Sequence, residues 1–416
     1  MQVLRMPPAA IRPFAESAAA RTSHETGIFD YTSGRWLYNE QRRLDERRLT
    51  FNVSALLTAA AESVNRQKED IKSFCKLGEG GFNRVFEMTM HDGLRIIARL
   101  PYPSTQPKFL ATSSEVATMD LVRRHSVPTP LVYAYSADAN NPVGSEYIVM
   151  ERIPGRSLTD IWYELCDKER VKILGKIVDQ EAKLFKIPLP AYGSIYKTSD
   201  LPNNVDHAGL EADAGQFCVG PDASLEYWFG TRSQLDVSRS PGKECTRSTL
   251  EYCEMFNYEK VNPDEHIRTL EKFVQVAAHT VPAEEWLRKP VIRHPDLSPN
   301  NIFVDDDCRT GLSSLRAALT ATKRPHLVQS LSLQQHADET MEKMLEQEDI
   351  DKKMGILRDA IGINTDGWVA FERYDAAVAA AKHIKAEALS YAENELDREM
   401  IEQHWPFDDF DEDGLC

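Results

Sequence analysis

The sequence predicts an α+β fold, in which a small lobe of strands around one helix precedes a mainly helical lobe. A hairpin with a glycine tip is expected over Phe74–Met88, and a further strand over Ile96–Leu100. Apolar runs bounded by glycine or proline are typical of strands. After Pro154–Gly155 the apolar residues mostly recur at helical spacing, which favours helices in the second lobe.

Local signals predict the other elements of the small lobe. Ser54 can cap a helix, because apolar residues follow it at helical spacing. Thr112–Glu115 has the form of a capping box and is expected to open the next helix. Apolar runs at Leu131–Tyr135 and Tyr147–Met150 predict two more strands.

Two amphipathic helices are predicted in the second lobe. The first ends before Pro188 and carries the apolar residues Val171, Leu174, Ile177, Val178, Ala182 and Phe185. The second carries Ile267, Leu270, Phe273, Val274 and Ala277. The aromatic residues between them are interpreted either as core or as the lining of a substrate pocket: Tyr192, Tyr196, Tyr227, Trp228 and Phe229.

The composition argues against several classes of protein. Of the 416 residues 42% are hydrophobic, which is enough for a sizeable core. A net charge of −16 should repel a polyphosphate backbone, so nucleic-acid binding is not expected. Seven cysteines without a C-x-x-C pair argue against a zinc site or a disulfide framework. The sequence has no apolar run of the roughly 18 residues that span a membrane.

Residues 1–28 have a distinctive composition. They contain Arg5, Arg12 and Arg21, several Ala and Ser, and only two acidic residues. Such a composition is typical of a mitochondrial presequence, although it is also compatible with a frayed terminus. The composition of residues 1–28 alone is therefore compatible with either a mitochondrial or a cytoplasmic location.

The strongest chemical motif is HPDLSPNN, His294–Asn301, which contains H-x-D-x-x-x-x-N. This is the spacing of a phosphotransferase catalytic loop, so Asp296 and His294 are the candidate catalytic residues. In such a loop the Asp orients or deprotonates a substrate hydroxyl, and the Asn, here Asn301, binds magnesium on the nucleotide phosphates. The alternative is an ordinary turn, because Pro, Asp, Ser and Asn are turn residues.

The glycine hairpin is a second, weaker motif. Gly78, Gly80 and Gly81 allow the backbone to approach phosphates closely, and backbone amides can donate to them. The match to G-x-G-x-x-G-x-V is partial, because Asn83 stands where the third glycine is expected. A glycine-rich turn without a ligand is the alternative.

Arg99 and Glu115 form the third motif. In kinases a lysine on the third strand pairs with a helix glutamate and holds the phosphates, and Arg99 stands at the position of that lysine. Arginine can replace it bidentately, although the two cations are not equivalent. The alternatives are a charge at a strand edge for Arg99 and simple capping in the first helical turn for Glu115.

The order of these motifs resembles that of kinases, and the chain is similar to the fungal aminoglycoside-phosphotransferase-like proteins, in particular to the altered inheritance of mitochondria branch. The segments that carry the resemblance are YTSGRWLYNE (31–40), FNV (51–53), KLGEGGFNRVF (76–86), IIARLPYP (96–103), YIVMERIPG (147–155), HPDLSPNNIFV (294–304) and WPFDD (405–409).

The resemblance implies a bilobal protein-kinase-like fold that binds ATP and Mg²⁺ in the cleft. It implies that Asp296 is the catalytic Asp, that Asn301 is a metal ligand, and that Glu151 and Ile153 lie on the hinge that meets the adenine. It also favours the mitochondrial interpretation of residues 1–28.

One part of the metal site departs from the family pattern T-G-L-I-D-W. Ser314 stands where a second metal-binding Asp is expected, and the family pattern is lost until about Gly367–Trp368. The second lobe is therefore expected to be shortened. Asp305–Asp307 are acidic and close by, but a hairpin turn explains them better than a substitute metal site.

These observations predict four segments: a presequence (1–28), a helical extension (29–72), an N-lobe (73–152) and a C-lobe with an acidic tail (153–416). The expected activity is ATP-dependent phosphoryl transfer to a hydroxyl of a small molecule, the acceptor being unknown. The alternative is a kinase-shaped binding or scaffold protein in mitochondria that performs no transfer. A third interpretation is an unstable product that lacks a packed piece of the C-lobe.

Overall fold

The computed structural model describes residues 26–228, 230–235, 239–241, 284, 289–294, 297–305, 310–312 and 351–411. Its largest sheet is antiparallel and has the order β2-β3-β4-β6-β5. The strands are β2 (Ile71–Glu79), β3 (Asn83–Met90), β4 (Arg95–Pro101), β5 (Val132–Ser136) and β6 (Tyr147–Glu151). All five expected strands are therefore present.

Each face of this sheet is covered by a helix. On one face α3 (Val53–Ser63) buries Leu56 and Ala60 against a core that includes Phe86. On the other face α4 (Lys108–Arg124) buries Val116 and Met119 against Ile97 and other apolar residues. Because strand side chains alternate between the two faces, one sheet supplies both cores.

The expected helix starts were wrong in two places. Asn52, not Ser54, caps α3, and its side chain accepts a hydrogen bond from the amide of Ala55 at 3.1 Å. The helix α4 starts at Lys108, after Pro107, so the predicted capping box lies inside the helix. Pro107 is the N-cap residue of α4 and offers no side-chain cap.

The second lobe is built on short strands around a long helix. Its elements are β7 (Arg156–Ser157), α5 (Leu158–Ile161), α6 (Asp167–Lys186), β8 (Ser194–Lys197), β9 (Ala208–Gly209), β10 (Phe217–Gly220), β11 (Ile302–Val304) and β12 (Thr310–Leu312). The strands form two sheets, with orders β8-β10-β9 and β12-β11-β7. The predicted helix over 267–277 lies outside the described residues, as does most of the segment before Gly367 in which the lobe is expected to be shortened.

The long helix α6 turns an unexpected face inward. Ile173 and Leu184 are buried, whereas Val171 and Val178 are 69% and 61% exposed. Apolar residues lie on more than one side of this helix, so their spacing alone does not select the buried face.

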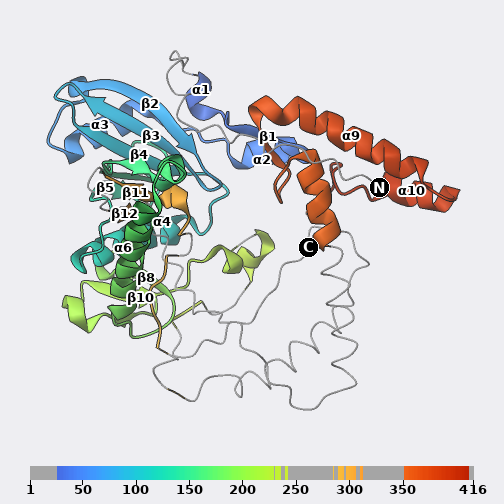
Figure 1. The fold of residues 1–416 in the computed structure, drawn as a ribbon. Helices are drawn as coiled ribbons and strands as arrows, with labels where there is room; N and C mark the ends of the chain where they lie inside the picture. The colour runs from blue at the N-terminus through green and yellow to red at the C-terminus, as the bar shows by residue number, and fades with distance from the viewer. Residues whose placement is uncertain are drawn as a thin grey trace.

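A third group of elements joins the two ends of the described chain. It contains α1 (Thr26–Phe29), β1 (Gly34–Trp36), α2 (Glu40–Glu46), β13 (Trp368–Ala370), α9 (Tyr374–Ser390) and α10 (Glu395–Gln403). Strands β1 and β13 pair antiparallel, with Trp36 opposite Trp368. Figure 1 shows α9 and α10 beside β1 and α2, away from the sheet that β2 and β3 form.

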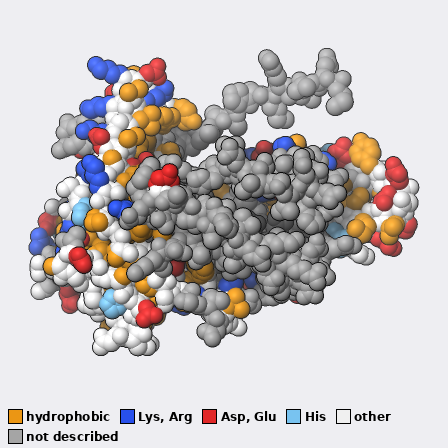
Figure 2. Space-filling view, turned by 90° about the horizontal axis from the view of Figure 1, so that it is seen from below, with side chains coloured by type: hydrophobic (Ala, Val, Ile, Leu, Met, Phe, Trp, Pro, Cys, Tyr) orange, Lys and Arg blue, Asp and Glu red, His pale blue; other side chains and the backbone are white. Residues whose placement is uncertain are grey.

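The structure also contains short 3-10 helices: Lys68–Asp70, Thr198–Asp200, Glu211–Asp213, Leu225–Tyr227, Gly230–Gln234, Pro299–Asn301 and Phe371–Arg373. Acidic and apolar side chains occur together at the end of the molecule that α9 and α10 form (Figure 2). Within the described ranges, no helix combines the length and apolar character needed to cross a membrane.

The expected α+β fold with kinase-like lobes is confirmed. A small antiparallel sheet with one helix on its inner face is followed, after Pro154–Gly155, by a lobe centred on α6. The difference from expectation is that α3, from the predicted helical extension, packs directly on the outer face of the sheet.

Candidate functional site

Arg99 and Glu115 meet as predicted. Arg99 lies on β4, and its Nη1 forms an ion pair with Oε1 of Glu115 on α4. The two side chains are only 11% and 7% exposed. Glu115 lies about two turns inside α4, so it does not cap the first turn as expected. Its buried carboxylate instead forms the ion pair with the guanidinium of Arg99.

The glycine hairpin is well ordered around its tip. The amide of Gly80 donates to the carbonyl of Asn83 at 2.9 Å. The carbonyl of Phe82 accepts from the amide of Tyr102 at 2.9 Å and from Oγ1 of Thr105 at 2.7 Å. These bonds fix the turn against the segment that follows β4.

The fold itself does not require glycine at any of the three candidate positions. A Cβ atom at Gly78 or Gly81 would meet no heavy atom within 4 Å, and one at Gly80 would meet only an ordinary contact at 3.7 Å. None of the three has a positive φ. Packing and backbone strain therefore do not account for these glycines, and the open space beside them leaves room for a ligand close to the backbone.

Behind the hairpin lies a buried charge cluster that sequence reasoning missed. Arg84 is fully buried, and its Nε lies 3.1 Å from Oε1 of Glu79. Glu79 also accepts hydrogen bonds from the amide of Thr32 and the hydroxyl of Ser33, both at 2.8 Å, and from Lys76 at 2.9 Å. The cluster ties the hairpin to the segment that precedes the sheet.

The carboxylate of Glu79 is held in its charged form. Burial alone would raise its pKa, but the hydrogen bonds from Lys76, Thr32 and Ser33 outweigh burial, and the pKa lies below its usual value.

The predicted hinge residues lie at the end of β6. The carboxylate of Glu151 accepts from the amide of Leu131 at 3.0 Å. The carbonyl of Ile153 accepts from Nη1 of Arg152 at 2.9 Å, and Nε of Arg152 donates to Glu87 at 2.7 Å. Arg152 therefore anchors the hinge to β3, a role that its sequence context does not indicate.

The predicted catalytic loop follows a buried segment. His294 is 8% exposed and Ile292 is fully buried. Asp296, the candidate catalytic Asp, lies outside the described residues. Asn301 ends the 3-10 helix Pro299–Asn301, and its Nδ2 donates to Oγ of Ser298 at 3.4 Å.

The described part of this loop packs against the first residues after the hinge. Oγ of Ser157 donates to the carbonyl of Pro299 at 3.3 Å, and Oγ1 of Thr159 donates to Oδ1 of Asn300 at 2.7 Å. Strand β7 pairs with β11, with Ser157 opposite Phe303. The hinge and the candidate catalytic loop are therefore neighbours.

Only part of the expected magnesium site lies in the described chain. Asn301 and Asp305 are described, but Ser314 and the other acidic residues after Val304 are not. Among the described residues, no three His, Cys, Asp or Glu side chains cluster in a way that could hold a metal ion. The amide of Asn301 fits one oxygen ligand of magnesium, and one ligand alone does not make a site.

The aromatic residues described in this segment make contacts within the protein. Tyr196 is fully buried, and its hydroxyl donates to the carbonyl of Pro221 at 2.8 Å, so it belongs to the core. The indole of Trp228 donates to the carbonyl of Asp222 at 2.8 Å and lies under the guanidinium of Arg239. Phe229 lies outside the described residues.

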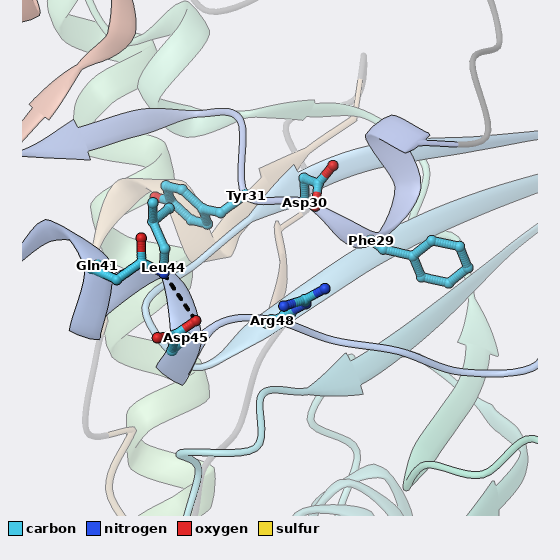
Figure 3. A pocket seen from close by; sticks show the side chains of 7 residues that line it. All are labelled: Phe29, Asp30, Tyr31, Gln41, Leu44, Asp45 and Arg48. Atoms are coloured by element: carbon cyan, nitrogen blue, oxygen red, sulfur yellow. Dashed lines mark hydrogen bonds between the residues drawn. The ribbon is translucent and has the colours of Figure 1, made fainter.

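A pocket of about 260 Å³ lies behind the hairpin, between segment 29–31 and α2. Figure 3 shows its lining residues Phe29, Asp30, Tyr31, Gln41, Leu44, Asp45 and Arg48. None of the residues predicted for the site lines it. Gln41 and Asp45 bond to each other across one turn of α2 at 3.1 Å.

Comparison with known proteins identifies relatives of two kinds. A subtelomeric hrmA-associated cluster protein of Aspergillus fumigatus is 34% identical over 288 residues, which cover 57% of this chain and 55% of that protein. Altered inheritance of mitochondria protein 9, mitochondrial, of Lachancea thermotolerans is 23% identical over 67% of this chain and 60% of that protein. The chain spans a little over half the length of these curated relatives.

Solved structures resemble the chain only loosely. Aminoglycoside phosphotransferase APH(4)-Ia, in a ternary complex with ADP and hygromycin B, is 13% identical with a TM-score of 0.35, over 64% of this chain and 71% of that chain. A likeness at this level adds nothing about function.

The family assignment comes from the sequence. The model of the phosphotransferase enzyme family (APH) matches residues 73–312, which is well over half of the chain and includes the hairpin, Arg99, Glu115, the hinge and the predicted catalytic loop. The resemblance to the altered inheritance of mitochondria branch is confirmed as well. This chain belongs to the phosphotransferase enzyme family.

Proposed function

We propose that the chain is an ATP-dependent phosphotransferase that acts on a hydroxyl group of a small molecule. The observation that carries this proposal is the buried ion pair of Arg99 with Glu115 on α4. Arg99 lies on the same sheet as a glycine hairpin whose glycines the fold does not require. A fixed cation beside an open, glycine-rich backbone suits the phosphates of a nucleotide.

The other predicted residues have defined roles in this proposal. Asp296 orients the acceptor hydroxyl and accepts its proton, and His294 supports the loop that carries Asp296. The backbone of Glu151 and Ile153 meets the adenine. Asn301 holds magnesium, which when bound neutralises charge on the phosphates.

Thermal melting of the purified protein with ATP tests nucleotide binding. A ligand at about 100 times its Kd stabilises a protein by about 2.7 kcal/mol. We expect ATP to raise the melting temperature by several degrees, and more with magnesium than without it. A cooperative melt that ATP leaves unchanged at every magnesium concentration contradicts the proposal.

Asp296→Ala tests the transfer step separately from binding. We expect this variant to retain the ATP-dependent rise in melting temperature but to lose phosphoryl transfer, because only the acceptor loses its partner. Unchanged turnover in this variant would rule out the role of Asp296.

A binding protein without transfer is the second candidate. It is favoured by Ser314, because losing a metal-binding carboxylate removes one of the charges that hold magnesium on the phosphates. This candidate predicts that ATP stabilises the protein equally with and without magnesium and that no ADP is released in a single-turnover assay.

The mitochondrial location is also proposed. It is supported by relatives that are named as mitochondrial, such as the Lachancea thermotolerans protein, and by the basic, acid-poor composition of residues 1–28. Fractionation of cells that express the full chain with a C-terminal tag tests it. Recovery of the tagged chain outside mitochondria would contradict it.

A further inference from the structure

The two departures from the kinase pattern in the small lobe lie in contact with each other. Asn83 replaces the third glycine of the hairpin, and Arg99 replaces the strand lysine. In the structure these two residues lie on the adjacent strands β3 and β4. Val85 is opposite Arg99 and Pro101 is opposite Asn83, so Asn83 and Arg99 are diagonal neighbours on one face of the sheet.

The contact is a bidentate hydrogen bond. The amide orientation of Asn83 is assigned from its neighbours. In the orientation that satisfies them, Oδ1 accepts from Nη2 of Arg99 at 2.6 Å and from Nε at 3.2 Å, while Nδ2 donates to the carbonyl of Phe82 at 3.3 Å. The opposite amide orientation would set donors against the guanidinium and an oxygen against a carbonyl. The side chain of Asn83 is only 9% exposed, so water competes little for these bonds.

The guanidinium of Arg99 is thus held from two sides. Glu115 holds Nη1 from the helix, and Asn83 holds Nε and Nη2 from the hairpin strand. A guanidinium has five N–H donors in a rigid fork, so donors remain for a phosphate after these contacts. A lysine ammonium also has three donors, but it lacks the rigid planar fork that an amide oxygen can hold in one orientation.

We propose that Asn83 is a positioning residue that orients Arg99 for nucleotide phosphates, so that the Gly-to-Asn and Lys-to-Arg departures form one functional pair. The proposal rests on the function proposed above. The third glycine can be replaced at this position because residue 83 begins β3 and pairs with Pro101, whereas the open tip lies at Gly80–Gly81.

A double-mutant cycle on nucleotide affinity tests the pairing. The four proteins are the wild type, Asn83→Ala, Arg99→Lys and the double variant, and the measurement is the Kd for ATP with magnesium by titration calorimetry. We expect each single variant to weaken binding about tenfold, the usual size for a lost hydrogen bond to a charged group. The double variant should be no weaker than Arg99→Lys alone, because Asn83 acts only through the arginine.

Additive losses, which would make the double variant about a hundredfold weaker than the wild type, overturn the positioning role. The matched control is Asn140→Ala in the exposed segment before β6. The hydrogen bond of Asn140 to Asp138 comes from its backbone amide and not from its side chain, so the Kd of this variant for ATP should not change. If Asn83→Ala does not fold, Asn83→Gly restores the residue of the common pattern and should show the same non-additivity with Arg99→Lys.

The outcomes also separate this inference from the proposed function. A folded wild type that binds no ATP overturns both. A wild type that binds ATP, combined with additive losses in the cycle, overturns the pairing of Asn83 with Arg99 and leaves the proposed function standing.

Discussion

At the scale of single residues, the charge cluster behind the hairpin has the largest predicted effect on stability. Arg84 donates from Nη1 to the carbonyls of Ile28 and Phe29 at 2.9 and 2.6 Å, and it forms an ion pair with Glu79. A buried pair is not a strong net source of stability, but removing one partner leaves the other charge buried and poorly compensated.

We therefore expect Arg84→Met to lower the free energy of unfolding by about 3 kcal/mol, the lower end of the range for breaking a buried pair, because Lys76 still neutralises Glu79. Urea denaturation measures this change. The control is Arg66→Met, which breaks an ion pair with Asp92 whose side chains are 44% and 46% exposed. That change should cost at most about 1 kcal/mol. Equal costs for the two variants would mean that burial of Arg84 is unimportant.

Glu79 makes the stability depend on pH. Its pKa in the folded protein lies below the ordinary value of 4.5, so its contribution is complete above about pH 4.5 and is lost as the pH falls through the lower, folded-state pKa. We expect the urea midpoint of the wild type to fall on acidification below pH 4.5 more steeply than that of Glu79→Gln. Parallel pH profiles for the two proteins would show that the carboxylate is not held in its charged form.

At the scale of elements, Gly155 lets the hinge run directly into β7. Its φ is +99°, and a Cβ atom there would lie 2.4 Å from the carbonyl oxygen of Val304 on β11. Gly93 also has a positive φ, +89°, but a Cβ atom there would meet nothing within 4 Å. Substituting Gly93 therefore tests backbone strain alone, whereas substituting Gly155 tests backbone strain together with steric contact.

We expect Gly93→Ala to cost about 1–2 kcal/mol, from the left-handed backbone alone. Gly155→Ala should cost clearly more, since β7 must also move away from β11. Thermal and urea unfolding of both variants measure the difference. If the two costs are the same, the close approach of β7 to β11 does not constrain the hinge.

Local sequence signals predicted most elements and part of the site. The hairpin, β4, β5, β6 and α6 were predicted because strand and helix periods and glycine or proline boundaries are local properties. The pairing of Arg99 with Glu115 was predicted from motif order and is present. The predictions of the start of α4 and of the buried face of α6 were wrong. Several residue types can begin a helix, and α6 carries apolar residues on more than one of its sides.

At the scale of the whole molecule, the contacts that no local signal could predict join distant parts of the chain. Trp36 is paired with Trp368 in the register of β1 and β13, and the amide of Asn39 bonds to Asp409. Periodicity reports which face of an element is apolar but not which distant element covers it. The segment between Tyr31 and Ser33 thereby connects residues 351–411 with the glycine hairpin.

This connection consists of specific bonds. The indole of Trp368 donates to the hydroxyl of Tyr31 at 3.0 Å, and the next two residues, Thr32 and Ser33, bond to Glu79 at the end of β2. Trp368 also lies against Gly34, where a Cβ atom would be only 2.4 Å from its indole nitrogen. A chain of contacts therefore links the hairpin to a residue far away in the sequence.

We expect Trp368→Ala to loosen the hairpin as well as β1. Hydrogen exchange followed by mass spectrometry should show amides of residues 31–36 and 79–84 exchanging about tenfold faster, because segments joined by packing open together. The control is Tyr391→Ala at the end of α9, where the side chain is 75% exposed, and its exchange pattern should match that of the wild type. Faster exchange confined to residues 31–36, with 79–84 unchanged, would show that the hairpin is ordered by the sheet alone and that the terminal segments have no influence on the candidate nucleotide site.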